Sequence, residues 1–227
     1  MGQRILIINP NSDREVTAAI DRRLEGLRFA GGPGLSCATL EDAPPGIETM
    51  RHIDEVSRPL CDLIDREDPK TDAFVIACFG DPAVASARET TRKPVLGIGE
   101  GGIAAALNHG ARYGIVTNLA GDVNPGLRQI RALGLDARLA GIEAAGIAVV
   151  DLADKVRSRS GLLGAAARLK ERGADVLVLG CAGMVPYAGE LEAETGLKVI
   201  DPVFATTAMA ICLVQAAVSG QAAGARA

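Results

Sequence analysis

Short apolar runs alternate with longer segments of helical periodicity along most of the chain. We expect the apolar runs to be strands at residues 4–9, 35–40, 73–78, 94–99, 113–118, 145–152, 175–181 and 197–201. We expect helices at residues 13–27, 48–67, 82–91, 100–109, 122–133, 159–172, 185–195 and 203–218. Runs such as LIIN and VLVLG are apolar at successive positions, as in parallel strands that are covered on both faces. The alternation therefore predicts an α/β fold built from βαβ units with mostly parallel sheets.

The chain also contains an internal repeat. Three landmarks recur in one order with nearly constant spacing, and they pair DAFVIAC with DVLVLGC, KPVLGI with LKVIDP, and RILIINPNSD with RYGIVTNLAGD. Repetition on this scale predicts a duplicated structural unit. We therefore expect two pseudosymmetric lobes, each with a mostly parallel four-stranded sheet flanked by helices. The first lobe would comprise residues 1–98 plus 205–227, and the second residues 99–204.

Both copies of one repeated strand end in a cysteine that is followed, one residue later, by a glycine. Cys78 lies in VIACFGD and Cys181 lies in VLGCAGM. Ligands of parallel α/β sheets bind at the carboxyl ends of the strands, so two facing lobes would bring both thiols to opposite walls of one cleft. Most reduced cysteines are packing residues, and we assign Cys37, Cys61 and Cys212 to that role.

A pair of thiols on opposite walls is suited to two-base racemisation. A thiol pKa of about 8.5 lies close to neutrality, and an adjacent helix N-terminus would lower it further. One thiolate would remove a proton from a substrate carbon, and the other thiol would return a proton to the opposite face. Each cysteine precedes a glycine-containing turn that we expect to lead into a helix, and backbone N–H groups there would stabilise the developing negative charge.

The charge pattern and the apolar runs argue against nucleic-acid and membrane partners. The formal net charge is −4 with both signs mixed along the chain, and no apolar run approaches the roughly 20 residues of a membrane span. The N-terminal segment lacks the features of a signal peptide, so the expected location is the cytoplasm. Five cysteines without a C-x-x-C pair favour free thiols over disulfides or a zinc site. GIGEGG matches the bare dinucleotide pattern, but no acidic residue ends a strand about 20 residues later, so no cofactor is expected.

Four motifs together carry a family resemblance: INPNS, IACFGDP, PVLGIGE and LGCAGM. With them the chain resembles the aspartate/glutamate/hydantoin racemase superfamily, and most of all its hydantoin and allantoin racemase branch. The resemblance implies a cofactor-independent racemase with Cys78 and Cys181 as the acid/base pair, and a homo-oligomer. It also implies that the substrate is bound by Asn11, Ser12, Phe79, Gly80, Thr117, Ala182 and Gly183.

The function that we expect is racemisation at C5 of a 5-substituted hydantoin or of allantoin, substrates whose α C–H is acidic. Within the superfamily, a maleate cis-trans isomerase and an aspartate/glutamate racemase are the alternatives. An arylmalonate decarboxylase is disfavoured because such enzymes keep a single catalytic cysteine. A non-catalytic protein that binds small ligands is the alternative from another class. The residues after the two cysteines differ, with Phe79 and Asp81 opposite Ala182 and Met184, and we expect this asymmetry to govern substrate choice.

Overall fold

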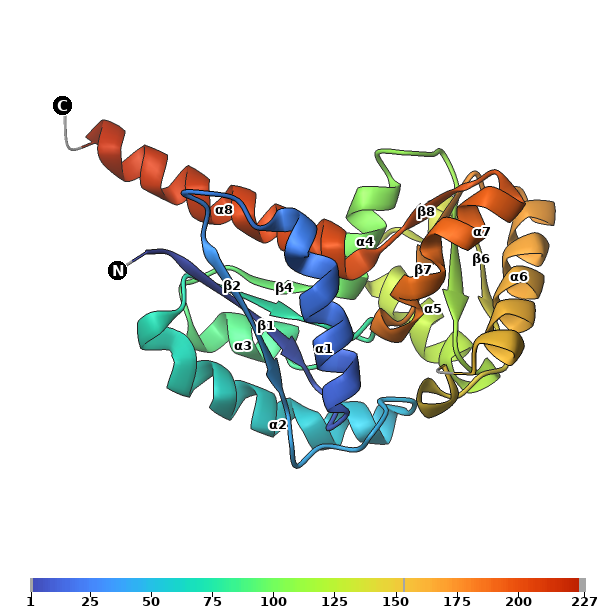
Figure 1. Cartoon of the computed structure of the whole chain (residues 1–227), viewed down its shortest axis with the longest axis horizontal. Coiled ribbons are helices and arrows are strands. Elements are labelled where there is room, and N and C mark those ends of the chain that lie inside the picture. The colour runs from blue at the N-terminus through green and yellow to red at the C-terminus, as the bar shows by residue number, and fades with distance from the viewer. Residues whose placement is uncertain (1, 153, 225–227) are drawn as a thin grey trace.

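The computed structural model describes residues 2–152 and 154–224, and these residues form two four-stranded parallel sheets (Figure 1). The first sheet has the order β2-β1-β3-β4. The second has the matching order β6-β5-β7-β8. The strands are β1 (Arg4–Asn9), β2 (Gly34–Thr39), β3 (Ala73–Ile76), β4 (Val95–Gly97), β5 (Tyr113–Thr117), β6 (Leu139–Ala144), β7 (Val176–Leu179) and β8 (Lys198–Ile200). The predicted α/β class with two four-stranded parallel sheets is confirmed.

Helices flank both sheets. They are α1 (Arg14–Arg23), α2 (Met50–Glu67), α3 (Val84–Thr90), α4 (Ile98–Ala106), α5 (Val123–Ala132), α6 (Lys155–Glu171), α7 (Ala188–Thr195) and α8 (Pro202–Gly224). Side-chain caps set several of their starts: Asp13 accepts backbone N–H groups at the start of α1, and Thr49 does so for α2. In the part of the chain that the structure describes, no helix is long and apolar enough to cross a membrane.

The alternation of side chains along β1 explains why each sheet is covered on both faces. Ile5 and Ile7 belong to one apolar cluster, whereas Leu6 and Ile8 belong to another on the opposite face. Helix α2 joins the second cluster through its buried residues Val56, Leu60 and Ile64, which recur every four positions. Burial of each such side chain contributes about 1.5–3 kcal/mol to stability.

Equivalent backbone hydrogen bonds relate the two lobes. The N–H of Ala77, just before Cys78, donates to the carbonyl of Ile8 at 2.8 Å. The N–H of Gly180, just before Cys181, donates to the carbonyl of Val116 at 2.7 Å. The two cysteine-bearing strand ends are therefore held in the same way by the central strand of their own sheet.

One predicted strand is wrong. Residues 145–152 form no strand, and the edge strand of the second sheet is β6, just before them. Gly146 takes a positive φ of 74° that ends the extended run, and a short 3-10 helix follows at Val149–Asp151. Ile147 and Val149 are nevertheless buried, so their apolar character reflects packing of a loop rather than a strand.

Helix α8 follows the last strand of the second sheet and returns to the first (Figure 1). It packs against α4 and against β3 and β1 of the first sheet. Asp201 caps its start by accepting the N–H groups of Val203 and Phe204. The division of the chain into 1–98 plus 205–227 and 99–204 stays a prediction, and its residues 1 and 225–227 lie outside the described residues.

Candidate active site

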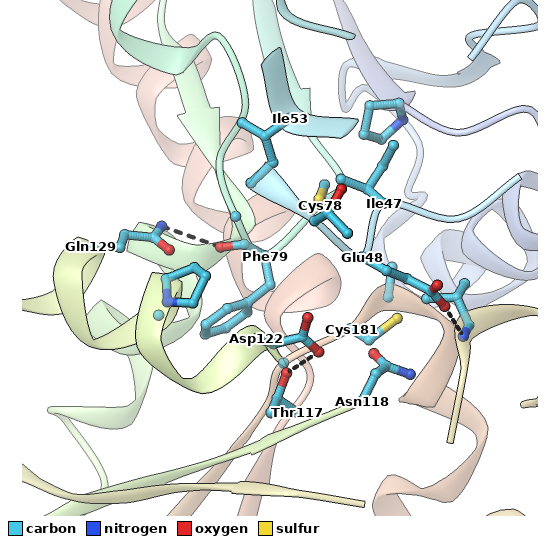
Figure 2. Close-up of a pocket in the computed structure, with 18 of the residues that line it drawn as sticks. Ile47, Glu48, Ile53, Cys78, Phe79, Thr117, Asn118, Asp122, Gln129 and Cys181 are labelled. Atoms are coloured by element: carbon cyan, nitrogen blue, oxygen red, sulfur yellow. Dashed lines mark hydrogen bonds between the residues drawn. The ribbon is translucent and has the colours of Figure 1, made fainter. Parts of the chain in front are cut away.

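A cavity of about 380 Å³ lies between the two lobes, at the carboxyl ends of their strands. Residues that follow β1 and β3 line it from the first lobe, and residues that follow β5 and β7 line it from the second. Cys78 and Cys181 both line this cavity, and Figure 2 shows them among its walls. The carboxyl ends of β3 and β7 therefore place the two thiols at the same cavity, as expected from the sequence.

The two cysteines occupy equivalent positions. Cys78 lies two residues after the end of β3, and Cys181 lies two residues after the end of β7. Each begins a turn closed by its own carbonyl, which accepts the N–H of Asp81 at 3.0 Å in one lobe and of Met184 at 3.1 Å in the other. The N–H of Gly80 hydrogen-bonds the Cys78 sulfur, and the N–H of Gly183 does the same for Cys181.

The pKa values of the two thiols depart from the sequence-based expectation. Burial raises the pKa of Cys78 to about 12, against the opposing effect of the Gly80 N–H. Burial likewise raises the pKa of Cys181 to about 11, and nearby carboxylates add to the rise. The predicted net lowering is wrong, because desolvation by burial outweighs the backbone N–H groups of Gly80, Gly183 and Met184, which do lower the pKa values of the two thiols.

Alkylation by iodoacetamide should report these raised pKa values. These pKa values leave only a small fraction of either cavity thiol as thiolate at pH 7. At any pH below the pKa, that fraction rises tenfold when the pH is raised by one unit. We therefore expect the alkylation rates of Cys78 and Cys181 to be slow at pH 7 and to rise roughly tenfold per unit up to about pH 10. Mass spectrometry of the separated peptides measures each rate, with the exposed Cys212 as a check on the reagent. Fast alkylation of either cavity thiol at pH 7 would contradict this assignment.

The cavity gathers most of the other residues that the resemblance implied. Those that line it are Asn11, Phe79, Gly80, Thr117, Ala182 and Gly183. Asn11 is buried, and its amide oxygen accepts hydrogen bonds from the Asn9 side chain and the Asp13 N–H. Its predicted role in binding the substrate would therefore depend on the amide nitrogen, which is a donor. Ser12 is not among the lining residues, and its N–H donates to the carbonyl of Pro44.

Two carboxylates that sequence reasoning missed also line the cavity (Figure 2). Asp122 accepts the hydroxyl of Thr117 at 3.1 Å and the N–H of Leu119 at 2.8 Å, and burial raises its pKa. Glu48 comes from the first lobe and accepts the N–H of Val149 in the second at 2.7 Å, which ties the lobes together across the cleft. The repeat could have revealed Asp122, which aligns with Asp13, whereas Glu48 comes from a loop without a counterpart in the repeat.

Asp81 and Met184 do not line the cavity, which corrects part of the expected asymmetry. The Asp81 carboxylate accepts the N–H groups of Gly99 and Glu100 at 2.8 Å each and so caps α4. Met184 is fully buried in the apolar cluster of the second lobe. The asymmetry that faces the cavity is therefore Phe79 opposite Ala182.

The structure thus defines an α/β protein of two similar lobes, each of which places one thiol at a shared cavity. The sequence model described as Asp/Glu/hydantoin racemase matches residues 5–210, and the chain belongs to this family, whose racemases are isomerases. Among the described residues, no group of three or more His, Cys, Asp or Glu side chains is arranged to hold a metal ion.

Three similar proteins illustrate this membership. A hydantoin racemase of Paenarthrobacter aurescens is 35% identical over 224 residues, which cover 93% of this chain and 91% of that protein. The structure of an allantoin racemase from Klebsiella pneumoniae matches with a TM-score of 0.87 and 29% identity, covering 95% of this chain and 89% of the other. That of an allantoin racemase from Pseudomonas fluorescens matches with a TM-score of 0.89 and 26% identity, covering 95% and 92%.

Proposed function

We propose that this protein racemises a neutral hydantoin ring at C5, on 5-substituted hydantoins or on allantoin, by proton transfer between two thiols. The observation that carries the proposal is the equivalence of Cys78 and Cys181, which line one cavity from two pseudosymmetric lobes. The names of the Paenarthrobacter, Klebsiella and Pseudomonas proteins support the same substrate class.

The chemistry needs only groups that the chain itself supplies. One cysteine, as thiolate, takes the C5 proton, and the electron pair passes into the adjacent ring carbonyl to form an enolate. The other cysteine, as thiol, donates its proton to the opposite face of C5 and becomes the thiolate. The backbone N–H groups of Gly80 and Gly183 donate to the two sulfurs and would stabilise the negative charge on whichever cysteine is the thiolate. The raised thiol pKa values make each thiolate a stronger base once it has formed.

The charges of the cavity favour a neutral ring over an amino acid or a dicarboxylate. Glu48 and Asp122 both line it and are partly buried, whereas Arg128, which also lines it, is exposed to solvent. Carboxylates accept hydrogen bonds from ring N–H groups, but they repel the carboxylate of aspartate, glutamate or maleate. This distribution disfavours the aspartate/glutamate racemase and maleate isomerase alternatives.

A substrate panel followed by polarimetry tests the proposed function. We expect optical rotation of single enantiomers of 5-substituted hydantoins or of allantoin to decay to zero. Aspartate and glutamate should keep their rotation, and maleate should yield no fumarate in a parallel assay. If the optical rotation decays with aspartate or glutamate alone, the protein is an amino-acid racemase. If no compound is turned over, the result favours a non-catalytic protein that binds small ligands.

A further inference from the structure

Gln129 connects the second lobe to the turn that carries Cys78. It lies on α5, and its side-chain amide donates to the carbonyl of Phe79 at 3.2 Å and to the carboxylate of Asp81 at 2.9 Å. Figure 2 shows the first of these bonds reaching from α5 to the residue next to Cys78. Both partners are acceptors, so the amide must present its nitrogen to them.

The turn that Gln129 holds is strained. Asp81 and Ala83 both have positive φ values, 48° and 60°, in a region that non-glycine residues rarely occupy. Such a conformation persists only where surrounding contacts determine it. The Asp81 carboxylate fixes the turn to the start of α4, and Gln129 fixes the same carboxylate and the Phe79 carbonyl to α5.

The equivalent position in the other lobe has different chemistry. Gln129 lies seven residues after Asp122, and Ile20 of α1 lies seven residues after the aligned Asp13. Ile20 is buried and shares an apolar cluster with Ala182, the residue that follows Cys181. Each cysteine turn is therefore held by a helix of the opposite lobe, through hydrogen bonds at Cys78 and through apolar packing at Cys181.

We propose that Gln129 is a positioning residue for Cys78 and not for Cys181. It acts through the Phe79 carbonyl and Asp81 on the turn whose Gly80 N–H faces the Cys78 sulfur. The consequence for catalysis rests on the proposed function, in which the two cysteines act on opposite faces of the substrate. Loss of the Gln129 hydrogen bonds should then disturb proton transfer on one face only.

Two variants remove the donor: Gln129→Met, of similar size, and Gln129→Glu, whose carboxylate cannot donate. We expect kcat/KM to fall about tenfold and equally for both enantiomers, because the equilibrium constant of a racemisation is one. In deuterium oxide, the Gln129 variants should exchange the C5 proton of one enantiomer without inverting it. That enantiomer should be the same one that Cys78→Ser exchanges without inversion. Arg131→Met, on an exposed position of the same helix α5 and outside the cavity lining, is the control and should behave like the wild type.

Cysteine alkylation gives a readout that does not depend on turnover. Gln129→Met should change the iodoacetamide rate of Cys78 by about threefold or more while that of Cys181 stays as in the wild type. Equal effects on both cysteines, no effect on either, or exchange that is the same for both enantiomers would overturn the positioning role. If the wild type racemises no compound of the panel, the proposed function fails, and the two alkylation rates still decide the role of Gln129.

Discussion

Replacement of either cavity cysteine by serine should abolish racemisation and leave one-sided proton exchange. In Cys78→Ser the remaining Cys181, as thiolate, can still remove the C5 proton of the enantiomer that presents it. The resulting thiol exchanges with solvent and returns a deuteron to the same face. The second face receives no proton, so kcat/KM for racemisation should fall by about 10³-fold or more. Cys181→Ser should show the same loss with exchange of the opposite enantiomer. NMR of C5–H in deuterium oxide, with chiral separation, measures both quantities.

The complementary pattern separates a two-thiol mechanism from a loss of structure. A variant that failed to fold would lose exchange of both enantiomers. Cys37→Ser is the control, because Cys37 is half-buried outside the cavity and should leave both reactions near wild-type rates. Two single variants that both racemise at near wild-type rates would refute the acid/base assignment of Cys78 and Cys181.

Gly99→Ala should destabilise the protein although alanine is the better helix former. Gly99 is the second residue of α4, and a Cβ there would fall on the carbonyl of Phe79 and lie 2.7 Å from Asp81 Oδ2 and 2.8 Å from Gln129 Nε2. The backbone at Phe79 would have to move, and overpacking of this kind lowers the free energy of unfolding by about 1–3 kcal/mol. Because the displaced turn carries Cys78, racemisation should fall as well. Urea unfolding and polarimetry measure the two effects.

Gly189→Ala is the matched control for Gly99→Ala. Gly189 is also the second residue of a helix, α7, but a Cβ there would meet nothing within 4 Å. Alanine should therefore leave stability unchanged or raise it by about 0.5–1 kcal/mol through helix propensity. Equal free energies of unfolding for the two variants would contradict the close packing of α4 against the Cys78 turn.

The parts of the structure that follow from strand periodicity and from the repeat could be predicted from the sequence. Successive apolar residues marked the central strands, and the aligned cysteines identified two equivalent strand ends at one cavity. The prediction failed at 145–152, because a buried loop and a buried strand have the same apolar composition and only the backbone at Gly146 distinguishes them.

The electrostatics of the site depend on contacts between residues that are far apart in the sequence, and a local sequence pattern does not reveal such contacts. Glu48 reaches the cavity from a loop and binds Val149, a residue 101 positions away. Desolvation of Cys78 and Cys181 depends on how two lobes close around them, so their raised pKa values could not be read from the adjacent turns. The same holds for Gln129, whose partners lie in the other lobe.

The central claim is that protons enter and leave C5 on opposite faces, and wild-type turnover in deuterium oxide tests it most directly. Each pure enantiomer of a hydantoin substrate is incubated briefly, and deuterium at C5 is measured separately in the remaining substrate and in the product. Two opposed thiols predict deuterium in the product enantiomer while the remaining substrate keeps its proton. Product that retains the substrate's own proton, or deuterium that enters substrate and product equally fast, would contradict the account.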